Sequence, residues 1–212
     1  MNKYKALLLA LFVLASVTVA PAYAAQKAPT QAATAQPILG EALVKKMMES
    51  GKPSETAVNI LALLAGDWHY TAAFWAEPGV EPQRSTGTIA NEMILESRFL
   101  SSTVLGTLNV GGHDVLVKGQ GLIGYDSAKK SFSSVWVDTT TTGMMIGAGK
   151  YDKKANAIKE TGQFTNPLSG EEERFRSELQ FTDADNYKRT IFAVGKSGKE
   201  SKLMEFDYSR GK

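Results

Sequence analysis

The sequence predicts an all-β protein: an antiparallel β-barrel of about ten strands, preceded by a short N-terminal helical segment. From Trp68 onward, apolar and polar residues alternate with the period of two that is typical of half-buried strands. Turn residues such as Pro78-Gly79, Gly111-Gly112 and Asn166-Pro167 separate these segments. The connections are short and contain no crossover helix. A meander of this size closes into a barrel or splits into a sandwich.

Residues 1–24 are typical of a cleavable signal peptide. Lys3 and Lys5 precede the apolar run Leu7–Ala20, and Ala22-Tyr23-Ala24 is a small-x-small cleavage site. The apolar run is shorter than the ~20 residues that a membrane-spanning helix needs. The sequence therefore predicts export to the periplasm or the extracellular space, with no membrane span after cleavage before Ala25.

The charge balance of the exported chain excludes some partners. Cleavage removes two of the 24 basic residues and leaves 22, against 22 acidic residues. A near-neutral chain has no basic field for nucleic acid, so no nucleic-acid partner is expected. The chain has no cysteine, so its stability must come from its core rather than from disulfides. The sequence carries no signal for a particular oligomeric state.

The segment 25–53 is predicted to contain a flexible spacer and a helix. Ala25–Pro37 is rich in Ala, Gln, Thr and Pro, a composition typical of linkers. Ile38–Ser50 carries apolar residues every four positions, which favours a helix ended by Gly51-Lys52-Pro53.

A single barrel domain is predicted for residues 54–212, beginning with a second, amphipathic helix. Ser54 can cap this helix, and Gly66 is expected to stop it. Its apolar stripe is Ala57, Val58, Ile60, Leu61 and Leu64. The strands predicted after it are Trp68–Ala76, Ser85–Leu95, Arg98–Leu108, Asp114–Tyr125, Ser131–Asp138, Thr142–Tyr151, Ala157–Thr165, Glu172–Phe181, Tyr187–Val194 and Ser201–Ser209.

The segment Gly119–Gly124 matches the dinucleotide-binding pattern G-x-G-x-x-G, with Asp138 at a suitable distance beyond it. That motif requires its glycines to open a helix whose N-terminus faces the pyrophosphate. Here the glycines fall within a predicted strand. We therefore interpret them as bends or close approaches of the barrel wall.

Several motifs carry a family resemblance. Gly66-Asp67-Trp68 entering the first strand, with Arg210 near the end of the last, resembles the calycin barrels (lipocalins, fatty-acid-binding proteins and relatives). Between about Leu61 and Arg210 the chain also resembles the DUF1579 family, a domain of unknown function. The segments that carry this second resemblance are Trp75–Gly79, Arg98–Leu100, Gly119–Asp126, Trp136–Asp138, Thr142–Met145 and Phe206–Arg210.

The calycin resemblance implies that Arg210 packs over Trp68 and closes one end of the barrel. If Trp68 points inward, alternation sends Tyr70, Ala72 and Phe74 inward as well. The inward residues expected on other strands are Met204, Phe206, Tyr208 and Arg210, then Phe175, Leu179 and Phe181, and also Met144, Ile146 and Ala148.

No cofactor or metal is expected. Related barrels of the nitrobindin type hold haem through a histidine, but His69 is predicted to face outward and His113 follows a turn. These two histidines also lack the spacing of zinc ligands, and there is no cysteine.

The ligand-binding candidates are Arg98, Trp136, Asp138, Met144 and Tyr208. Trp136 and Asp138 share one face of a strand, so an inward Trp136 brings a carboxylate inside, where it needs a partner such as Arg98. Met144 would supply an adaptable wall. The alternative is that Asp138 caps the following turn, while Trp136 and the methionines are packing residues.

The favoured function is the binding of a small apolar or amphipathic molecule inside the barrel. One alternative is an enzyme that uses Asp138, with Arg98 or Tyr208, for acid–base chemistry in the cavity. Another is a barrel filled by its own side chains that acts through its surface. No catalytic motif distinguishes them.

Overall fold

The structure is a computed structural model that describes residues 40–75, 77–110, 112–166 and 169–211. The predicted signal peptide, the predicted spacer Ala25–Pro37 and the first two residues of the helix predicted over Ile38–Ser50 lie outside these residues. The chain divides into residues 1–40 and a unit of residues 41–212, which contains every helix and strand given below.

Two helices precede the strands. Helix α1 spans Glu41–Ser50 and buries none of its residues, whereas α2 spans Glu55–Ala62 and buries Ala57, Ile60 and Leu61 of its apolar stripe. The Ser54 hydroxyl accepts a hydrogen bond from the Ala57 amide at 3.4 Å, as expected of an N-cap. Gly66 does not end α2. Its φ of 108° lets the chain turn into the first strand instead.

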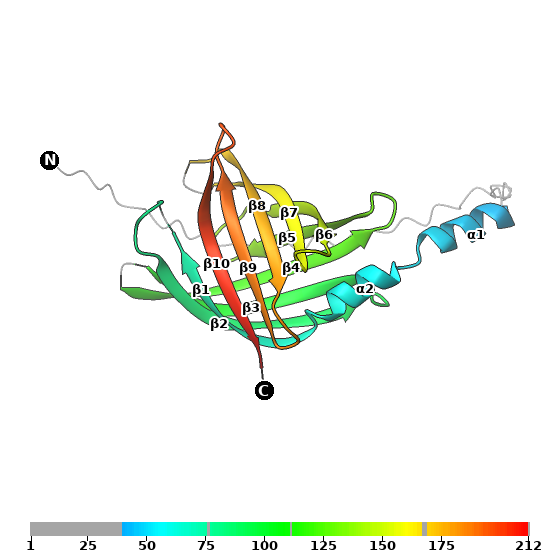
Figure 1. The fold of residues 1–212 in the computed structure, drawn as a ribbon, viewed down its shortest axis with the longest axis horizontal. Coiled ribbons are helices and arrows are strands. Elements are labelled where there is room, and N and C mark those ends of the chain that lie inside the picture. The colour runs from blue at the N-terminus through cyan, green and yellow to red at the C-terminus, as the bar shows by residue number, and fades with distance from the viewer. Residues whose placement is uncertain (1–39, 76, 111, 167–168, 212) are drawn as a thin grey trace, which may run out of the picture. The chain divides into compact units, whose positions relative to one another are not determined.

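Ten antiparallel strands form a closed barrel, in which each strand pairs with its neighbours in sequence and β1 pairs with β10 (Figure 1). This confirms the predicted fold class. The strands are β1 Gly66–Phe74, β2 Gln83–Ile94, β3 Phe99–Val110, β4 His113–Asp126, β5 Ser131–Asp138, β6 Met145–Asp152, β7 Ala157–Thr165, β8 Glu172–Phe181, β9 Asn186–Val194 and β10 Glu200–Arg210.

Alternation of side chains divides the barrel into an inner and an outer face. On β1, Trp68 and Tyr70 are buried, while His69 between them is exposed. The register pairs Trp68 with Arg210 and Tyr70 with Tyr208, so these β10 residues also face inward. The inner face is therefore rich in aromatic side chains from both ends of the chain.

Strand β6 corrects the expected orientation of one segment. The strand begins at Met145, where Met145 pairs with the inward residue Trp136, and Gly147 next faces inward. Ile146 and Ala148 thus point outward, and Ile146 is 54% exposed. The prediction was wrong because the β5–β6 connection contains more residues than expected, which shifts the alternation by one.

The two ends of the barrel differ. Helix α2 packs at the end formed by the β2–β3 and β4–β5 turns, where Leu64 accepts hydrogen bonds from the side chains of Trp68 and Asn91. A continuous core of α2 and strand residues fills this end, which we call the closed end. The opposite end, which carries the β1–β2, β3–β4, β5–β6, β7–β8 and β9–β10 connections, is called the open end.

Candidate binding site in the barrel interior

The closed end is held by Arg210. Its guanidinium carbon lies 4.1 Å from the centre of the Trp68 ring, an arrangement typical of a cation–π contact. The same guanidinium donates hydrogen bonds to the backbone oxygens of Ala65 and Ala184 at 3.0 and 2.9 Å. Arg210 therefore ties the segment before β1 and the β8–β9 turn to the end of β10.

Stacked tyrosines line the interior next to this closure. The rings of Tyr187 and Tyr208 stack with centroids 4.2 Å apart, and Tyr70 and Phe206 lie within 6.0 Å of Tyr208. Burial raises the pKa of Tyr208 and that of Tyr187 well above the ordinary tyrosine value, and it raises the pKa of Tyr70 as well. These phenols are neutral in the folded protein at physiological pH.

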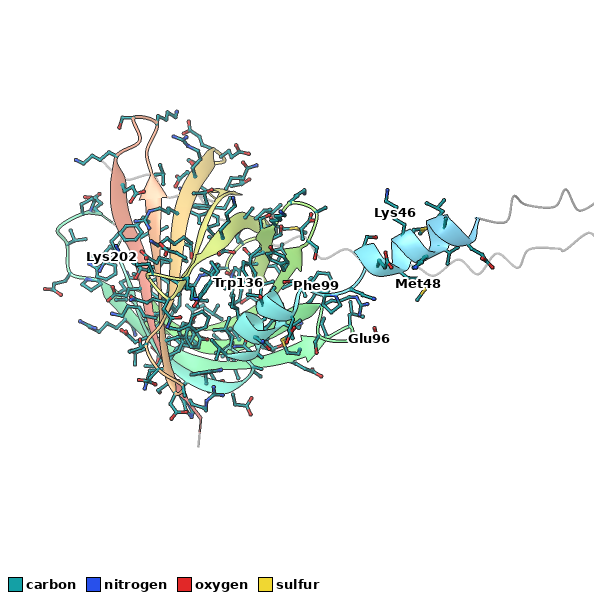
Figure 2. All side chains as sticks on the ribbon, turned by 45° about the vertical axis from the view of Figure 1, so that its right-hand side comes forward. Lys46, Met48, Glu96, Phe99, Trp136 and Lys202 are labelled. Carbon is teal, nitrogen blue, oxygen red and sulfur yellow. The ribbon has the colours of Figure 1, made fainter. Side chains whose placement is uncertain are left out.

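Trp136 and Asp138 lie side by side on the inner face of β5, and Figure 2 shows Trp136 among the strands. The indole Nε1 donates to Asp138 Oδ2 at 2.8 Å, and the Thr140 amide donates to Asp138 Oδ1 at 2.8 Å. Both carboxylate oxygens are thus engaged within this one strand and its turn. The bonds are those expected of a turn-capping aspartate, and an acid–base role for Asp138 stays a prediction.

Two glycines of the G-x-G-x-x-G segment explain how Trp136 fits. A Cβ added to Gly119 would collide with the indole, and one added to Gly121 would lie 3.1 Å from it. Gly124 in the same way faces the ring of Phe99. The glycines lie within β4, as predicted, and they permit close approach of aromatic rings rather than of a phosphate.

Arg98 is not the partner of Asp138, which corrects the sequence-based expectation. Its guanidinium pairs with Glu96 and donates to the backbone oxygen of Gly51 at 3.0 Å. Arg98 lines a surface hollow of about 360 Å³ beside α2 at the closed end. Asp138 instead pairs with Gly119, five residues along β4 from the partner of Phe99. The strand length separates the two side chains.

Met144 is also placed differently from the expectation. It lies in the connection before β6 and is 58% exposed, so it does not form an interior wall. The neighbouring Met145 is half-buried and pairs with Trp136. Among the five ligand-binding candidates, the structure brings Trp136 and Asp138 together, and it places Tyr208 on the inner face nearer the closed end.

A charged cluster in the interior was not found from the sequence. Glu160 on β7, Ser177 on β8 and Arg189 on β9 all point inward. Arg189 Nη2 lies 3.2 Å from Glu160 Oε2, and Arg189 Nε donates to Ser177 Oγ at 3.0 Å. Ser177 is fully buried and Glu160 is 4% exposed. The sequence did carry a signal. Glu160 lies two residues from Ile158 on β7, and Arg189 lies two residues from Ile191 on β9, so each charge shares the face of a buried isoleucine.

The second oxygen of Glu160 is unusual. Oε1 is buried and accepts no hydrogen bond from any residue that the structure describes. A buried carboxylate oxygen without a donor costs free energy, because it has lost its hydrogen bonds to water. An unsatisfied group of this kind is uncommon in folded proteins.

The inner face is packed at the closed end and solvent-accessible at the open end. Trp68, Leu100 and Ile158, near the closed end, are at most 2% exposed. Val115, which also faces inward but near the open end, is 44% exposed. Other inward apolar residues of the open half that remain only half-buried include Phe74, Leu108, Val117, Phe164 and Met204. Water therefore reaches apolar side chains inside the barrel.

The described residues contain no group of three or more side chains suited to hold a metal ion. His69 is exposed on the outer face of β1, and His113 is exposed at the start of β4. Within the same described ranges, no helix is long and apolar enough to cross a membrane.

Comparison with known proteins identifies relatives by fold. The crystal structure of Rv2717c from M. tuberculosis matches with a TM-score of 0.57 and 13% identity, over 76% of this chain and 100% of that one. The S-type phycobiliprotein lyase CPES from Guillardia theta matches with a TM-score of 0.52 and 8% identity, over 78% and 97%. No curated protein sequence matches significantly.

At these identities the two structures establish a shared barrel fold and no shared activity. A family profile described as "Protein of unknown function (DUF1579)" matches residues 52–210, which include α2 and all ten strands. The chain therefore belongs to the DUF1579 family.

Proposed function

We propose that this protein is exported and binds a small apolar or amphipathic molecule in the open half of its barrel. The observation that carries this proposal is the exposure of inward apolar side chains there. Burying such side chains against a ligand gains about 25 cal/mol for each Å² of apolar surface removed from water. A concave, mostly apolar interior with a few polar groups is the usual form of a small-molecule site.

The shared fold with a phycobiliprotein lyase supports an interior function only at the level of architecture, because a fold hosts many activities. The aromatic residues Phe74, Phe206 and Tyr208 offer flat apolar surface to a ligand. Trp136 with its bonded Asp138 lies on the inner face of β5, where a ligand would change its fluorescence.

The binding proposal can be tested by filling the interior. Val117 faces inward near the open end and the next residue, Lys118, faces outward on the same strand. We expect Nile red to gain fluorescence with the wild-type protein, and Val117→Trp to weaken its binding at least roughly tenfold by occupying the space. The matched control, Lys118→Trp, should bind Nile red like the wild type. Equal binding by both variants would contradict an interior site.

The export proposal has its own test. If residues 1–24 are removed on export, the intact mass of protein recovered from the periplasm or the culture medium of its own host should correspond to a chain beginning at Ala25. Changing Ala22 and Ala24 to bulky residues should cause the uncleaved precursor to accumulate. Recovery of the full-length chain in the cytoplasm would show that the protein is not exported.

A further inference from the structure

We propose that Glu160 binds the polar head of the ligand, and that this head is an uncharged hydrogen-bond donor such as a hydroxyl or an amide N–H. This inference rests on the proposed function, because it names the chemistry of a molecule held in the same interior. It starts from the buried Oε1 of Glu160, which accepts no hydrogen bond from the described residues.

Only one of the two carboxylate oxygens of Glu160 has a hydrogen-bond donor among the described residues. Oε2 is satisfied by Arg189, and Arg189 is in turn fixed by Ser177. These two contacts hold the carboxylate in one orientation. A donor on the ligand would satisfy Oε1 with a charge-assisted hydrogen bond, which is stronger than one between two neutral groups.

The absence of a side chain at Gly147 lets three side chains meet beside the carboxylate. A Cβ added to Gly147 would lie 2.9 Å from Ser134 Oγ, 3.3 Å from the Phe175 ring and 3.8 Å from Glu160 Cδ. These three side chains of β5, β7 and β8 therefore converge on a position of β6 that carries no side chain. This position is too tight even for a Cβ, so a head group that reaches Glu160 from this side must be small and must displace Ser134 Oγ or the Phe175 ring.

The charge of the cluster selects an uncharged head. Arg189 already neutralises Glu160, so a buried ammonium would add an uncompensated positive charge and a carboxylate would add a second negative charge next to Oε1. The other carboxylates at inward positions are engaged elsewhere: Asp138 binds Trp136, and Glu173 accepts from Asn166 at 2.7 Å. Neither of them is available to balance a charged ligand.

The apolar part of the ligand would extend from Glu160 toward the open end. Phe206 pairs with Arg189 across β9 and β10, and Met204 pairs with Ile191 one step nearer the open end. Phe206 and Met204 both remain half-buried, so they have surface to cover. The expected ligand class is a neutral amphipathic molecule with a donor head and an apolar tail.

Three ten-carbon probes test this selection: decan-1-ol, decanoic acid and decylamine, each displacing Nile red from the purified protein at neutral pH. Nile red has no N–H or O–H donor and reports interior binding independently of Glu160. We expect the alcohol to displace the dye at a concentration roughly tenfold lower than that of the acid or the amine.

The variant Glu160→Gln keeps the shape of the side chain, removes its charge and leaves Arg189 unpaired. It should weaken the binding of decan-1-ol and strengthen the binding of decanoic acid, so that the order of their affinities reverses. The matched control is Glu178→Gln on the outer face of β8, which should keep the wild-type order. If Glu160→Gln does not fold, Gly147→Ala adds a Cβ that crowds Ser134 Oγ and the Phe175 ring beside the carboxylate without changing a charge, and should weaken the binding of the alcohol alone.

The outcomes separate the two proposals. If the wild-type protein does not bind Nile red, the proposed interior function is wrong, and this inference is wrong with it. If the dye binds but the three probes displace it equally, or if neither Glu160→Gln nor Gly147→Ala changes their order, Glu160 does not bind the head group. In that case the proposed function stands and this inference is overturned.

Discussion

At the scale of single residues, the interior is shaped as much by missing side chains as by large ones. Trp136 lies over Gly119 and Gly121 of the neighbouring strand, and Tyr70 lies against Gly87 and Gly106 of β2 and β3. Each aromatic ring thus occupies space that a Cβ would otherwise fill. The glycines of β4 have this packing role, which explains why they match a nucleotide-binding pattern without its chemistry.

The fit of Trp136 gives a prediction. In Gly119→Ala the new methyl group collides with the indole, so Trp136 must shift away from Asp138. We expect a loss of about 1–3 kcal/mol in unfolding free energy, measured by urea denaturation. The control is Gly143→Ala, because a Cβ there meets its nearest atom at 3.6 Å. If both variants are equally stable, Trp136 is not confined by β4.

Residue orientation was predictable where the strand boundary was correct. Trp68, Tyr70 and Ala72 share the inner face as the alternation indicated, because side-chain direction in a strand is a local property. Met144 and Ile146 were assigned to the wrong face because the strand begins later than expected. A shift of one residue exchanges the two faces of a strand.

At the scale of elements, the outer face of the barrel carries ion pairs that cross strands. Arg176 on β8 reaches over β9, where its guanidinium lies 4.2 Å from the centre of the Phe192 ring, and binds Glu200 on β10 through two hydrogen bonds of 2.8 Å. The pair therefore links three successive strands next to the β9–β10 connection.

This pair predicts a pH dependence. Hydrogen bonding by Arg176 lowers the pKa of Glu200 below its ordinary value of 4.5. The pair should therefore stabilise the folded protein above that pH, and the stabilisation should be lost as the pH falls through the lower pKa of the folded state. Urea denaturation should show Glu200→Gln less stable than the wild type at neutral pH, with the difference vanishing in acid.

The control for this prediction is Glu81→Gln, in the exposed β1–β2 connection, which should not alter the pH profile. A difference between the wild type and Glu200→Gln that stays constant into acid would mean that the ion pair is not its source. High salt should reduce the difference at neutral pH, because exposed charges are screened.

The elements themselves were largely predictable, and their ends were less so. Both helices and all ten strands were expected from periodicity, and β5, β7 and β8 have the expected bounds. The β5–β6 connection was misjudged because Thr139–Gly143 contains residues that suit both a strand and a turn. The hydrogen bonds of Asp138 to Thr140 decide in favour of the turn.

At the scale of the whole molecule, barrel closure buries tyrosines that come from opposite ends of the chain. Tyr70 on β1 contacts Tyr208 on β10, and Tyr208 stacks on Tyr187 on β9. Burial raises the pKa of each of these phenols above the ordinary value of 10.0, and for Tyr208 the nearby Arg189 opposes this effect only in part.

The buried phenols predict an alkaline transition. Above pH 10.0 the unfolded chain loses phenol protons that the folded barrel retains, so the unfolding free energy should fall as the pH rises. The phenolate absorbance of these three tyrosines should therefore appear together with the loss of circular dichroism. Tyr208→Phe should reduce this late absorbance change by about a third. Complete ionisation before unfolding would contradict the burial of these rings.

The sequence by itself determined most of the secondary structure and the antiparallel meander, because two-residue periodicity and turn residues are local signals. Its resemblance to calycin barrels also indicated the pairing of Trp68 with Arg210. Only the tertiary structure decided which polar residues meet inside. Glu160, Ser177 and Arg189 come together from three strands, while the length of β4 keeps Arg98 from Asp138. Such contacts depend on register and closure, which no local pattern encodes.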